Sequence, residues 1–458
     1  MTIHQVDVVV LGLGPGGEDV AGQLAEAGLR VAGIEHHLVG GECPYYGCIP
    51  SKMIIRAADL LQEARRVNVM AGTSTVTPDF SKVAQRIRDE ATDDWDDTVA
   101  VDRFVGKGGI FVRGRGVLDG RGRVQVGDDT YVAIRGVVIA TGTSPSLPSI
   151  PGLADARPWT NREVVKIRGV PTSLIVLGGG AIGLEIAQAF GRFGSKITVI
   201  EALDRILAPE EPETSELLTT VLRSEGVDIR TGVATKAVAR SEAGLVTVTL
   251  ADGSEVRAEE ILVAAGRTPN VRNIGLGTIG LDETARPTFV VDEHMRILGA
   301  TGLWAVGDIT GRGAFTHMAV YEAGVAVDDI LGTSSPRLAE SHAVSRVTFT
   351  DPEVGSVGMT EAQAREAGLD VRIGLADSST SSRGWIHGEG NAGLMKLVMD
   401  AKAGVLVGAS SVGPRGGEVL SMFNLAVHGR VPVEQLRTMI YAYPTFYRGA
   451  LDALAALD

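Results

Sequence analysis

The feature that most constrains the fold is an apolar strand that runs directly into a glycine-rich loop. Residues 6–11 are apolar, and Gly12-Leu13-Gly14-Pro15-Gly16-Gly17 follows them at once. Behind the loop, apolar residues recur at helical spacing, and a second apolar run, 29–34, ends on Glu35. Strand, glycine turn, helix, strand and acid in this order predict a Rossmann-type βαβ unit that binds a dinucleotide. We expect Gly12, Gly14 and Gly17 to let the backbone approach a pyrophosphate at the helix N-terminus.

The same unit occurs a second time. Residues 174–177 lead into Gly178-Gly179-Gly180-Ala181-Ile182-Gly183, and the strand at 196–200 ends on Glu201. Glu201 follows Gly178 by the same number of residues as Glu35 follows Gly12. A single glycine-rich match is weak, but two complete units with equal internal spacing predict two bound dinucleotides.

Each unit is followed by a strand that ends in a turn of small residues. These turns are Thr141-Gly142 after residues 137–140 and Ala265-Gly266-Arg267 after residues 261–264. Residues 301–308 are predicted to form a strand that ends on Asp308, with a helix to about residue 331. From residue 336 onward, strands at 344–349, 394–399 and 405–410 occur without a glycine fingerprint and predict an α+β domain.

Composition excludes several classes of protein. The net charge of −13 argues against a nucleic-acid partner, whose phosphates require a basic surface. No N-terminal secretory pattern and no run of about 18 apolar residues occurs, so we expect a cytoplasmic protein without a membrane partner.

The chain has only two cysteines, Cys43 and Cys48. Zinc would need two further ligands, and no histidine flanks the pair at a suitable spacing, so we predict no metal site. Pro50 suits a first helical turn, which would place Cys48 at a helix N-terminus where a thiolate is stabilised. A redox-active pair is therefore the better interpretation, and inert small core residues are the alternative.

These motifs make the chain recognisable. The block Gly40-Gly41-Glu42-Cys43-Pro44-Tyr45-Tyr46-Gly47-Cys48-Ile49-Pro50-Ser51-Lys52, both fingerprints, the segment ending at Asp308 and Phe349-Thr350-Asp351-Pro352-Glu353 resemble the class I pyridine nucleotide-disulfide oxidoreductases. That family includes dihydrolipoamide dehydrogenase, glutathione reductase and mercuric reductase. The likeness extends from residue 6 to about residue 455.

The resemblance implies an α/β fold with two Rossmann-like domains and a C-terminal α+β dimerisation domain. Residues 1–150 and 270–335 would bind FAD, 151–269 would bind NAD(P)H, and 336–458 would form a homodimer. The implied FAD contacts are Gly12, Gly14, Gly17, Glu35, Gly41, Thr141, Gly142 and Asp308. The implied NAD(P)H contacts are Gly178, Gly180, Gly183, Glu201 and Gly266.

The resemblance also implies catalytic roles. Cys48 would be the thiol that faces the flavin, and Cys43 the outer thiol that exchanges with substrate. Lys52 would lie by the reactive edge of the flavin and pair with Glu185. Because Glu201 accepts hydrogen bonds from ribose hydroxyls and repels a 2′-phosphate, we expect NADH. Arg205 lies close enough in sequence to leave NADPH open.

The pattern is broken near the C-terminus. The family's disulfide reductases carry His-x-His-Pro-x-x-x-Glu, whose second histidine is the acid-base group for thiol exchange. Here Tyr443 replaces that histidine and Arg448 replaces the glutamate. A phenol ionises near pH 10 and cannot shuttle protons at neutral pH as an imidazole does. Tyr443 either fills space at the dimer interface or contacts the substrate.

Three functions remain open. The first is an NADH-oxidising flavoenzyme that reduces a quinone, a metal ion, an oxidised small molecule or oxygen. The second is a dihydrolipoamide dehydrogenase-like or other disulfide reductase, or a mercuric reductase-like enzyme, although the C-terminal cysteine pair of mercuric reductases is missing. The third is a non-catalytic flavin redox sensor, which a complete second fingerprint disfavours.

Overall fold

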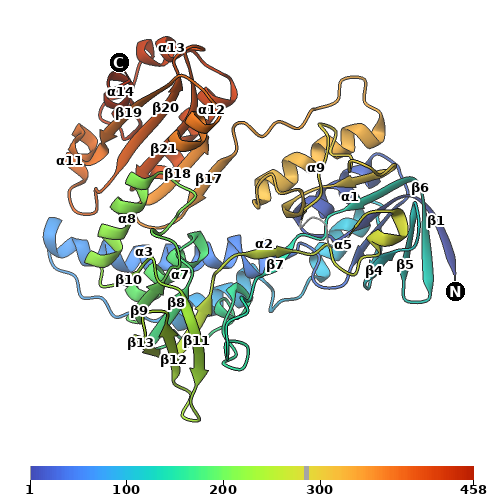
Figure 1. Cartoon of the computed structure of the whole chain (residues 1–458), viewed down its shortest axis with the longest axis horizontal. Coiled ribbons are helices and arrows are strands. Elements are labelled where there is room, and N and C mark those ends of the chain that lie inside the picture. The colour runs from blue at the N-terminus through green and yellow to red at the C-terminus, as the bar shows by residue number, and fades with distance from the viewer. Residues whose placement is uncertain (1, 283–287, 458) are drawn as a thin grey trace. The chain divides into compact units, whose positions relative to one another are not determined.

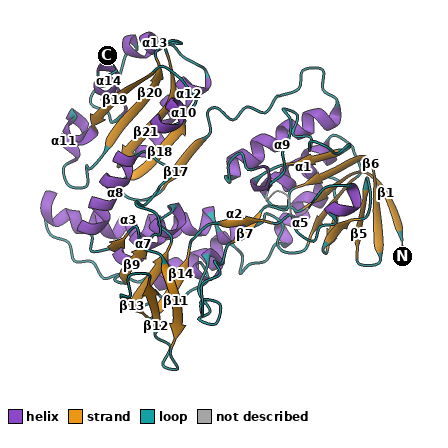
Figure 2. Cartoon of the chain, viewed as in Figure 1, coloured by secondary structure: helices purple, strands orange, loops and turns teal. Residues whose placement is uncertain are grey.

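The computed structural model describes residues 2–282 and 288–457, which fold into two compact units. Unit 1 comprises residues 1–50, 86–145 and 267–341. Unit 2 comprises residues 51–85, 146–266 and 342–458. Figure 1 labels the elements in chain order, and Figure 2 shows helices next to sheets in both units. Each unit is therefore assembled from three separate stretches of the chain.

Unit 1 is built on a sheet in the order β3-β2-β1-β6-β5-β4, with β16 paired to β6. Strands β3, β2, β1, β6 and β16 run parallel, whereas β5 is antiparallel to both of its neighbours, β6 and β4. The elements are β1 Ile3–Leu11, α1 Pro15–Glu26, β2 Val31–Glu35, α2 Glu42–Tyr46, a π-helical turn Ile87–Ala91, α5 Thr98–Gly106, β3 Ile110–Arg113, β4 Gly116–Leu118, β5 Arg123–Val126, β6 Asp129–Ile139, β7 Thr143–Pro145, β15 Arg267–Pro269, β16 Leu303–Ala305 and α9 Thr316–Leu331, with short 3₁₀ turns at Leu276–Ile279 and Asp308–Thr310.

The core of unit 1 explains the apolar run at its N-terminus. Val8, Val9 and Val10 of β1 are fully buried, as expected for a parallel strand that is covered on both faces. Helices α1 and α9 lie side by side (Figure 1), and Gly16 of α1 fits against Ala319 of α9. The close packing of these two helices holds the N-terminus of α1 at the carboxyl end of β1.

Unit 2 begins with the second nucleotide fold. Its parallel sheet has the order β10-β9-β8-β14, and an antiparallel sheet β11-β12-β13 accompanies it. The elements are α3 Cys48–Met70 (whose first residues belong to unit 1), α4 Phe80–Arg86, α6 Asn161–Val164, β8 Ser173–Leu177, α7 Ala181–Arg192, β9 Lys196–Ile200, α8 Pro212–Ser224, β10 Asp228–Arg230, β11 Thr235–Arg240, β12 Val246–Leu250, β13 Glu255–Ala258 and β14 Glu260–Val263.

The C-terminal part of unit 2 is an α+β fold. Its five-stranded antiparallel sheet has the order β17-β18-β21-β20-β19. Helix α12 packs on β18 and β21, where Gly355 meets Leu420, and α14 packs on β19 and β20. The elements are β17 Ser345–Thr348, β18 Glu353–Gly358, α10 Glu361–Glu366, β19 Val371–Asp377, α11 Ser382–His387, β20 Leu394–Asp400, β21 Val405–Gly413, α12 Gly416–His428, α13 Val433–Thr438 and α14 Ala450–Ala455, with 3₁₀ turns at Ser378–Thr380 and Tyr447–Gly449.

The predicted fold class is confirmed, but the bounds of several strands differ from their predictions. The strand expected over residues 301–308 is limited to β16, Leu303–Ala305. Gly307 has φ +81°, outside the strand region, and Asp308 opens a short 3₁₀ turn. Within the described part of the chain, every helix is too short or too polar to span a bilayer.

A buried carboxyl group holds the turn that carries Asp308. Glu322 of α9 is 1% exposed, accepts a hydrogen bond from the Gly307 amide at 2.7 Å and lies 3.0 Å from the Thr310 hydroxyl. Burial raises the pKa of Glu322 to about 7, although these two hydrogen bonds act in the opposite direction. The carboxyl group therefore binds its proton more tightly in the folded chain than in the unfolded chain.

This difference predicts a pH-dependent stability. Stability contributed by Glu322 is fully present below the unfolded pKa of 4.5 and is lost as pH rises through about 7, a change of about 3 kcal/mol. Glu322→Gln should therefore raise the urea midpoint at pH 8 and change it little at pH 5. Exposed Glu242→Gln is the control. An equal effect of Glu322→Gln at both pH values would contradict the assignment.

Candidate active site

The two glycine loops have the same geometry in their respective units. A Cβ atom at the first glycine would overlap the carbonyl oxygen of the neighbouring strand, and one at the third glycine would overlap the carbonyl oxygen of the first. The second glycine has no such neighbour within 4 Å, so its face is open to a ligand. These positions are Gly12, Gly14 and Gly17 in unit 1 and Gly178, Gly180 and Gly183 in unit 2, and Gly12 and Gly178 have positive φ.

The acid that ends the second strand turns back onto its loop. Glu35 accepts hydrogen bonds from the amides of Leu13 (2.8 Å) and His37 (2.7 Å). Although burial alone would raise it, hydrogen bonds from His36 and these amides hold the pKa of Glu35 below its ordinary value. Glu201 repeats this arrangement with the amides of Gly179 (2.7 Å) and Leu203 (2.8 Å). Each carboxylate thus lies beside a glycine loop.

Asp308 is held by a chain of side chains in unit 1. The Thr143 hydroxyl donates to Asp308 at 2.5 Å and accepts from Arg267 Nε at 2.7 Å. Arg267 also lies 3.4 Å from Glu42, next to Cys43. The Asp308 carboxylate is therefore oriented by a network that reaches the cysteine-containing segment.

The turn that follows β6 contains an unpaired polar atom. The hydroxyl of Thr141 is buried and makes no hydrogen bond with any residue that the structure describes, while its carbonyl accepts from Asn270 at 3.0 Å. The neighbouring Gly142 carbonyl accepts from the Asn270 amide at 2.9 Å. A buried hydroxyl next to the first glycine loop matches the polar contact that a bound dinucleotide would supply.

The two cysteines lie on successive helices. Cys43 belongs to the short helix α2, and Cys48 is the first residue of α3. Gly41 packs against Gly14, so the cysteine-containing segment lies beside the first glycine loop. Cys48 Sγ is 3.5 Å from the hydroxyl of Thr316, the first residue of α9. Either group can donate in this contact, and a thiolate at Cys48 would accept from the Thr316 hydroxyl and be stabilised by the amide dipoles at the helix start.

Tyr45, between the two cysteines, is held by a loop that is distant in sequence. Trp95 donates its indole N–H to the carbonyl oxygen of Tyr45 at 3.1 Å, and the Tyr45 hydroxyl donates to the Asp96 carbonyl at 3.3 Å. Asp93, Asp94 and Trp95 all have positive φ, a conformation that non-glycine residues adopt at a cost. The conformation of α2 is therefore tied to a strained turn elsewhere in unit 1.

In unit 2, Lys52 is held from two sides. Its Nζ atom lies 2.8 Å from Glu185 Oε2 and 4.7 Å from the centre of the Phe349 ring. Glu185 is 4% exposed, and its other oxygen accepts from the Phe349 amide at 2.8 Å. The ammonium group therefore has a fixed position on α3 while remaining partly exposed.

The tyrosine at the C-terminal break is exposed. Tyr443 is 67% exposed, and the Arg448 guanidinium lies 5.3 Å from the centre of its ring. The two residues that replace the family's His and Glu thus still contact each other, through a cation–π interaction.

The structure divides the predicted site residues between the units. Unit 1 holds both cysteines and the predicted FAD contacts, whereas unit 2 holds Lys52, Glu185, Tyr443 and the predicted NAD(P)H contacts, Gly266 included. Sequence reasoning missed Thr316 and the roles of Arg267 and Phe349 as neighbours of site residues. Arg267 lies in the small-residue turn after residues 261–264, and Phe349 opens the motif at 349–353. No local sequence motif marks Thr316.

The donor sets fit two dinucleotides. In each loop the second glycine leaves room for a pyrophosphate, and the acid at the end of the next strand lies beside the loop. In unit 1 the buried Thr141 hydroxyl offers a further polar contact. Among residues 2–282 and 288–457, no three His, Cys, Asp or Glu side chains gather as a metal site requires.

Comparisons with known proteins agree with this geometry. The family model of the pyridine nucleotide-disulphide oxidoreductases matches residues 6–323, and that of their dimerisation domain matches residues 344–453. A dihydrolipoyl dehydrogenase of Thermus scotoductus is 32% identical over 98% of this chain and 97% of its own length. A mercuric reductase of Acidithiobacillus ferrooxidans is 30% identical over 97% of this chain and 81% of its own length.

A solved structure shares the fold over the full length. The Cu(II) complex of the HOCl-induced flavoprotein disulfide reductase RclA from Escherichia coli superposes with a TM-score of 0.87 and 26% identity. The match covers 99% of this chain and 100% of that chain.

The contact between Cys48 and Thr316 gives a testable prediction. If Cys48 faces the flavin, Cys43→Ser should show a long-wavelength charge-transfer band without added reductant, and Cys48→Ser should show none. In the Cys43→Ser background, Thr316→Val removes one hydrogen bond of about 1 kcal/mol, so the midpoint pH of the band should rise by about 0.7 units. Absorbance titration measures it.

Thr333→Val, after the opposite end of α9, is the matched control because the Thr333 hydroxyl bonds only to the Asp328 carbonyl in the described structure. A band that is retained in Cys48→Ser and lost in Cys43→Ser would reverse the roles of the two thiols.

Proposed function

Because this chain belongs to the pyridine nucleotide-disulphide oxidoreductase family, we propose that it oxidises NADH and reduces an acceptor other than a standard dithiol substrate. The enzyme is an FAD- and NAD(P)H-dependent oxidoreductase. A quinone, a metal ion or an oxidised small molecule is the proposed class of acceptor. When bound, FAD would take a hydride from NADH and pass the electrons to the Cys43–Cys48 pair or directly to the acceptor.

The proposed roles of the side chains follow from their surroundings. Lys52 is a fixed positive charge that stabilises negative charge on the reduced cofactor, and Glu185 orients it. Asp308, held by Thr143, binds the ribitol chain. Cys48 holds a thiolate beside Thr316, and Cys43 is the outer thiol. Residues 1–150 and 270–335 form the FAD-binding domain, and residues 151–269 bind NADH.

The observation that carries the proposal is the Tyr443–Arg448 pair. In a dithiol reductase, a histidine oriented by a glutamate protonates the leaving thiolate. Here a phenol and a guanidinium occupy these two positions and contact each other, so the imidazole–carboxylate pair is missing. Electron delivery by Lys52, Glu185 and the cysteines is kept, so an acceptor that needs no such proton donor fits best.

The preference for NADH rests on Glu201 and Arg205. The Glu201 carboxylate beside the Gly179 amide would accept from ribose hydroxyls and repel a 2′-phosphate. Arg205 donates from Nη1 to the Glu210 carbonyl at 3.0 Å and to the Ser215 hydroxyl at 3.2 Å. Because these bonds hold the guanidinium at the start of α8, they disfavour its use as a phosphate ligand.

The dimerisation domain supports a homodimer, with residues 336–458 as the proposed interface domain.

A second candidate function is disulfide reduction with another proton donor, which the similarity to dihydrolipoyl dehydrogenases favours. A mercuric reductase is disfavoured because the chain has only two cysteines.

The cofactor preference can be tested at Glu201. Wild type should use NADH with a higher kcat/KM than NADPH. Glu201→Gln removes the negative charge and keeps the size of the side chain. It should lower the NADH-to-NADPH ratio of kcat/KM by about tenfold, equivalent to about 1.4 kcal/mol. Glu216→Gln, on the exposed side of α8, is the control. A wild type that prefers NADPH would contradict the proposal.

The acceptor class can be tested by comparing disulfides with quinones. Wild type should reduce quinones readily and turn over lipoamide or glutathione disulfide slowly, because acid-base catalysis by a placed histidine contributes about 10²–10⁴-fold. Tyr443→His together with Arg448→Glu should raise disulfide turnover, and the quinone rate of the same variant is the internal control. Efficient, pH-dependent disulfide turnover by wild type would favour the dihydrolipoamide dehydrogenase-like alternative.

A further inference from the structure

Helices α3 and α7 are joined by a ladder of polar contacts in unit 2. Lys52 of α3 pairs with Glu185 of α7 at 2.8 Å, and seven residues further along each helix Asp59 pairs with Arg192 at 2.7 Å. Residues seven positions apart lie on one face of a helix. The two helices therefore run parallel with their charged faces in register.

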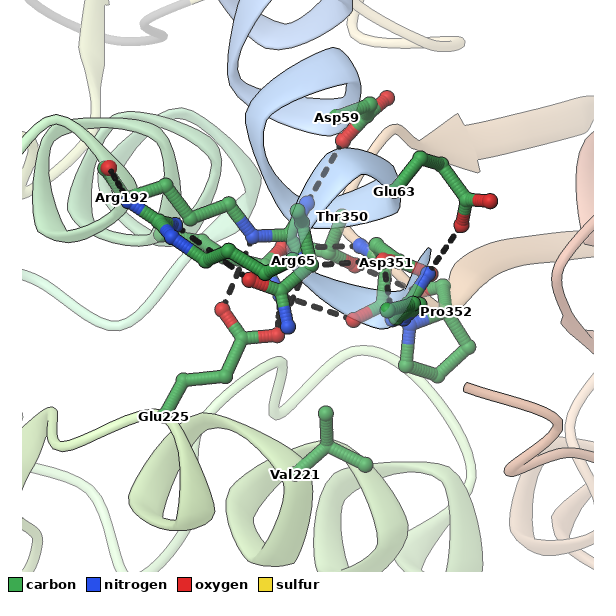
Figure 3. A network of polar contacts seen from close by, with 12 residues as sticks. Asp59, Glu63, Arg65, Arg192, Val221, Glu225, Thr350, Asp351 and Pro352 are labelled. Carbon is green, nitrogen blue, oxygen red and sulfur yellow. Dashed lines mark hydrogen bonds and ion pairs between the residues drawn. The ribbon is translucent and has the colours of Figure 1, made fainter. Parts of the chain in front are cut away.

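The far end of the ladder is a partly buried ionic cluster around the buried side chain of Arg192 (Figure 3). Arg192 is 3% exposed and lies 2.7 Å from each of the carboxylates of Asp59, Glu225 and Asp351. Arg66 of α3 also contacts Asp351, at 2.8 Å, and Arg65 donates to the carbonyl oxygen of Arg192 at 2.6 Å. The Arg192 guanidinium thus links α3, the C-terminal end of α8 and the segment 349–353 to helix α7.

Segment 349–353 links the two ends of the ladder. Gln188, between Glu185 and Arg192 on the same face of α7, exchanges two hydrogen bonds with the backbone of Asp351, both at 2.8 Å. Two residues earlier, Phe349 donates its amide to Glu185 and places its ring 4.7 Å from Lys52 Nζ. A displacement of Asp351 would therefore move the group that packs against Lys52.

Such a cluster contributes little net free energy to folding. Removing several charges from water costs several kcal/mol per ion, and apolar packing of the same volume is often as stable or more so. What directional ion pairs provide is register. Because α-helices rise 1.5 Å per residue, a slip of one residue between α3 and α7 would move Lys52 by about 1.5 Å, and catalytic groups tolerate little displacement of that size.

We propose that Arg192 is a positioning residue that fixes Lys52 on α3 for electron transfer, acting from two helical turns away through Asp59 and Asp351. This role rests on the proposed function of Lys52 beside the flavin. It involves no contact of Arg192 with substrate or cofactor.

A double-mutant cycle on the flavin-loaded enzyme tests the role. Lys52→Met, Arg192→Met and the double variant are compared by the equilibrium midpoint potential of the flavin and by stopped-flow reduction with NADH. Arg192→Met should shift the potential in the same negative direction as Lys52→Met and slow reduction by about 10–100-fold. In the Lys52→Met background, the Arg192 substitution should have no further effect on the potential, because its influence acts through Lys52.

Controls separate positioning from folding. Arg240→Met removes an ion pair with Glu260 at 2.6 Å in the same unit and should lower the melting temperature without moving the potential. If Arg192→Met does not fold, Asp59→Asn replaces it and should give a smaller shift of the same sign. Arg192→Lys, which keeps the charge but loses the planar fork, should restore part of the shift.

The outcomes distinguish the two levels of the hypothesis. An unchanged potential in Lys52→Met would overturn the proposed role of Lys52, and the positioning role with it. A shift in Lys52→Met without a shift in Arg192→Met would overturn the positioning role alone. Additive shifts in the double variant would show that Arg192 acts independently of Lys52, which also overturns the inference.

Discussion

The arrangement of the molecule depends on a hydrogen bond from a loop amide to the carboxylate that ends the next strand. In unit 1 the amide after the first glycine binds Glu35, and in unit 2 the equivalent amide binds Glu201. This bond closes the loop over the carboxyl ends of the parallel strands, where the helix N-terminus supplies further amides. The open second glycine then faces the space that a pyrophosphate would occupy.

The same chain uses buried charge for a different purpose in unit 2. Glu185, Gln188 and Arg192 occupy one face of α7, and each is at most 4% exposed. An apolar face would pack at a lower desolvation cost, but it would not discriminate between neighbouring registers. Polar pairs at seven-residue spacing do discriminate, because a one-residue slip breaks all of them together. The penalty of burying charge is thus offset by a defined position for α3, which carries Lys52.

Local features of the site were predictable from the sequence. Both fingerprints, the acids at their ends and the helix start at Cys48 are encoded within short windows, and the structure places them as the patterns indicate. The sheet β11-β12-β13 was missed because its short strands lie within a domain already explained by its fingerprint. The strand at 301–308 was predicted too long because Gly307 ends it through its positive φ. The pairing of Cys48 with Thr316 and of Arg192 with Asp351 joins residues far apart in sequence, which no periodicity reveals.

In the proposed function, electron delivery and proton delivery are separable because different elements would carry them. Lys52 and Glu185 belong to α3 and α7, whereas Tyr443 and Arg448 lie between α13 and α14. Replacing His by Tyr and Glu by Arg therefore leaves the Lys52–Glu185 ion pair intact and exchanges a proton-transfer pair for a cation–π contact. We propose that such an exchange alters which acceptors are reduced fast without altering how electrons enter. An acceptor that takes electrons without a thiolate leaving group loses nothing by the change, whereas a disulfide loses its proton donor.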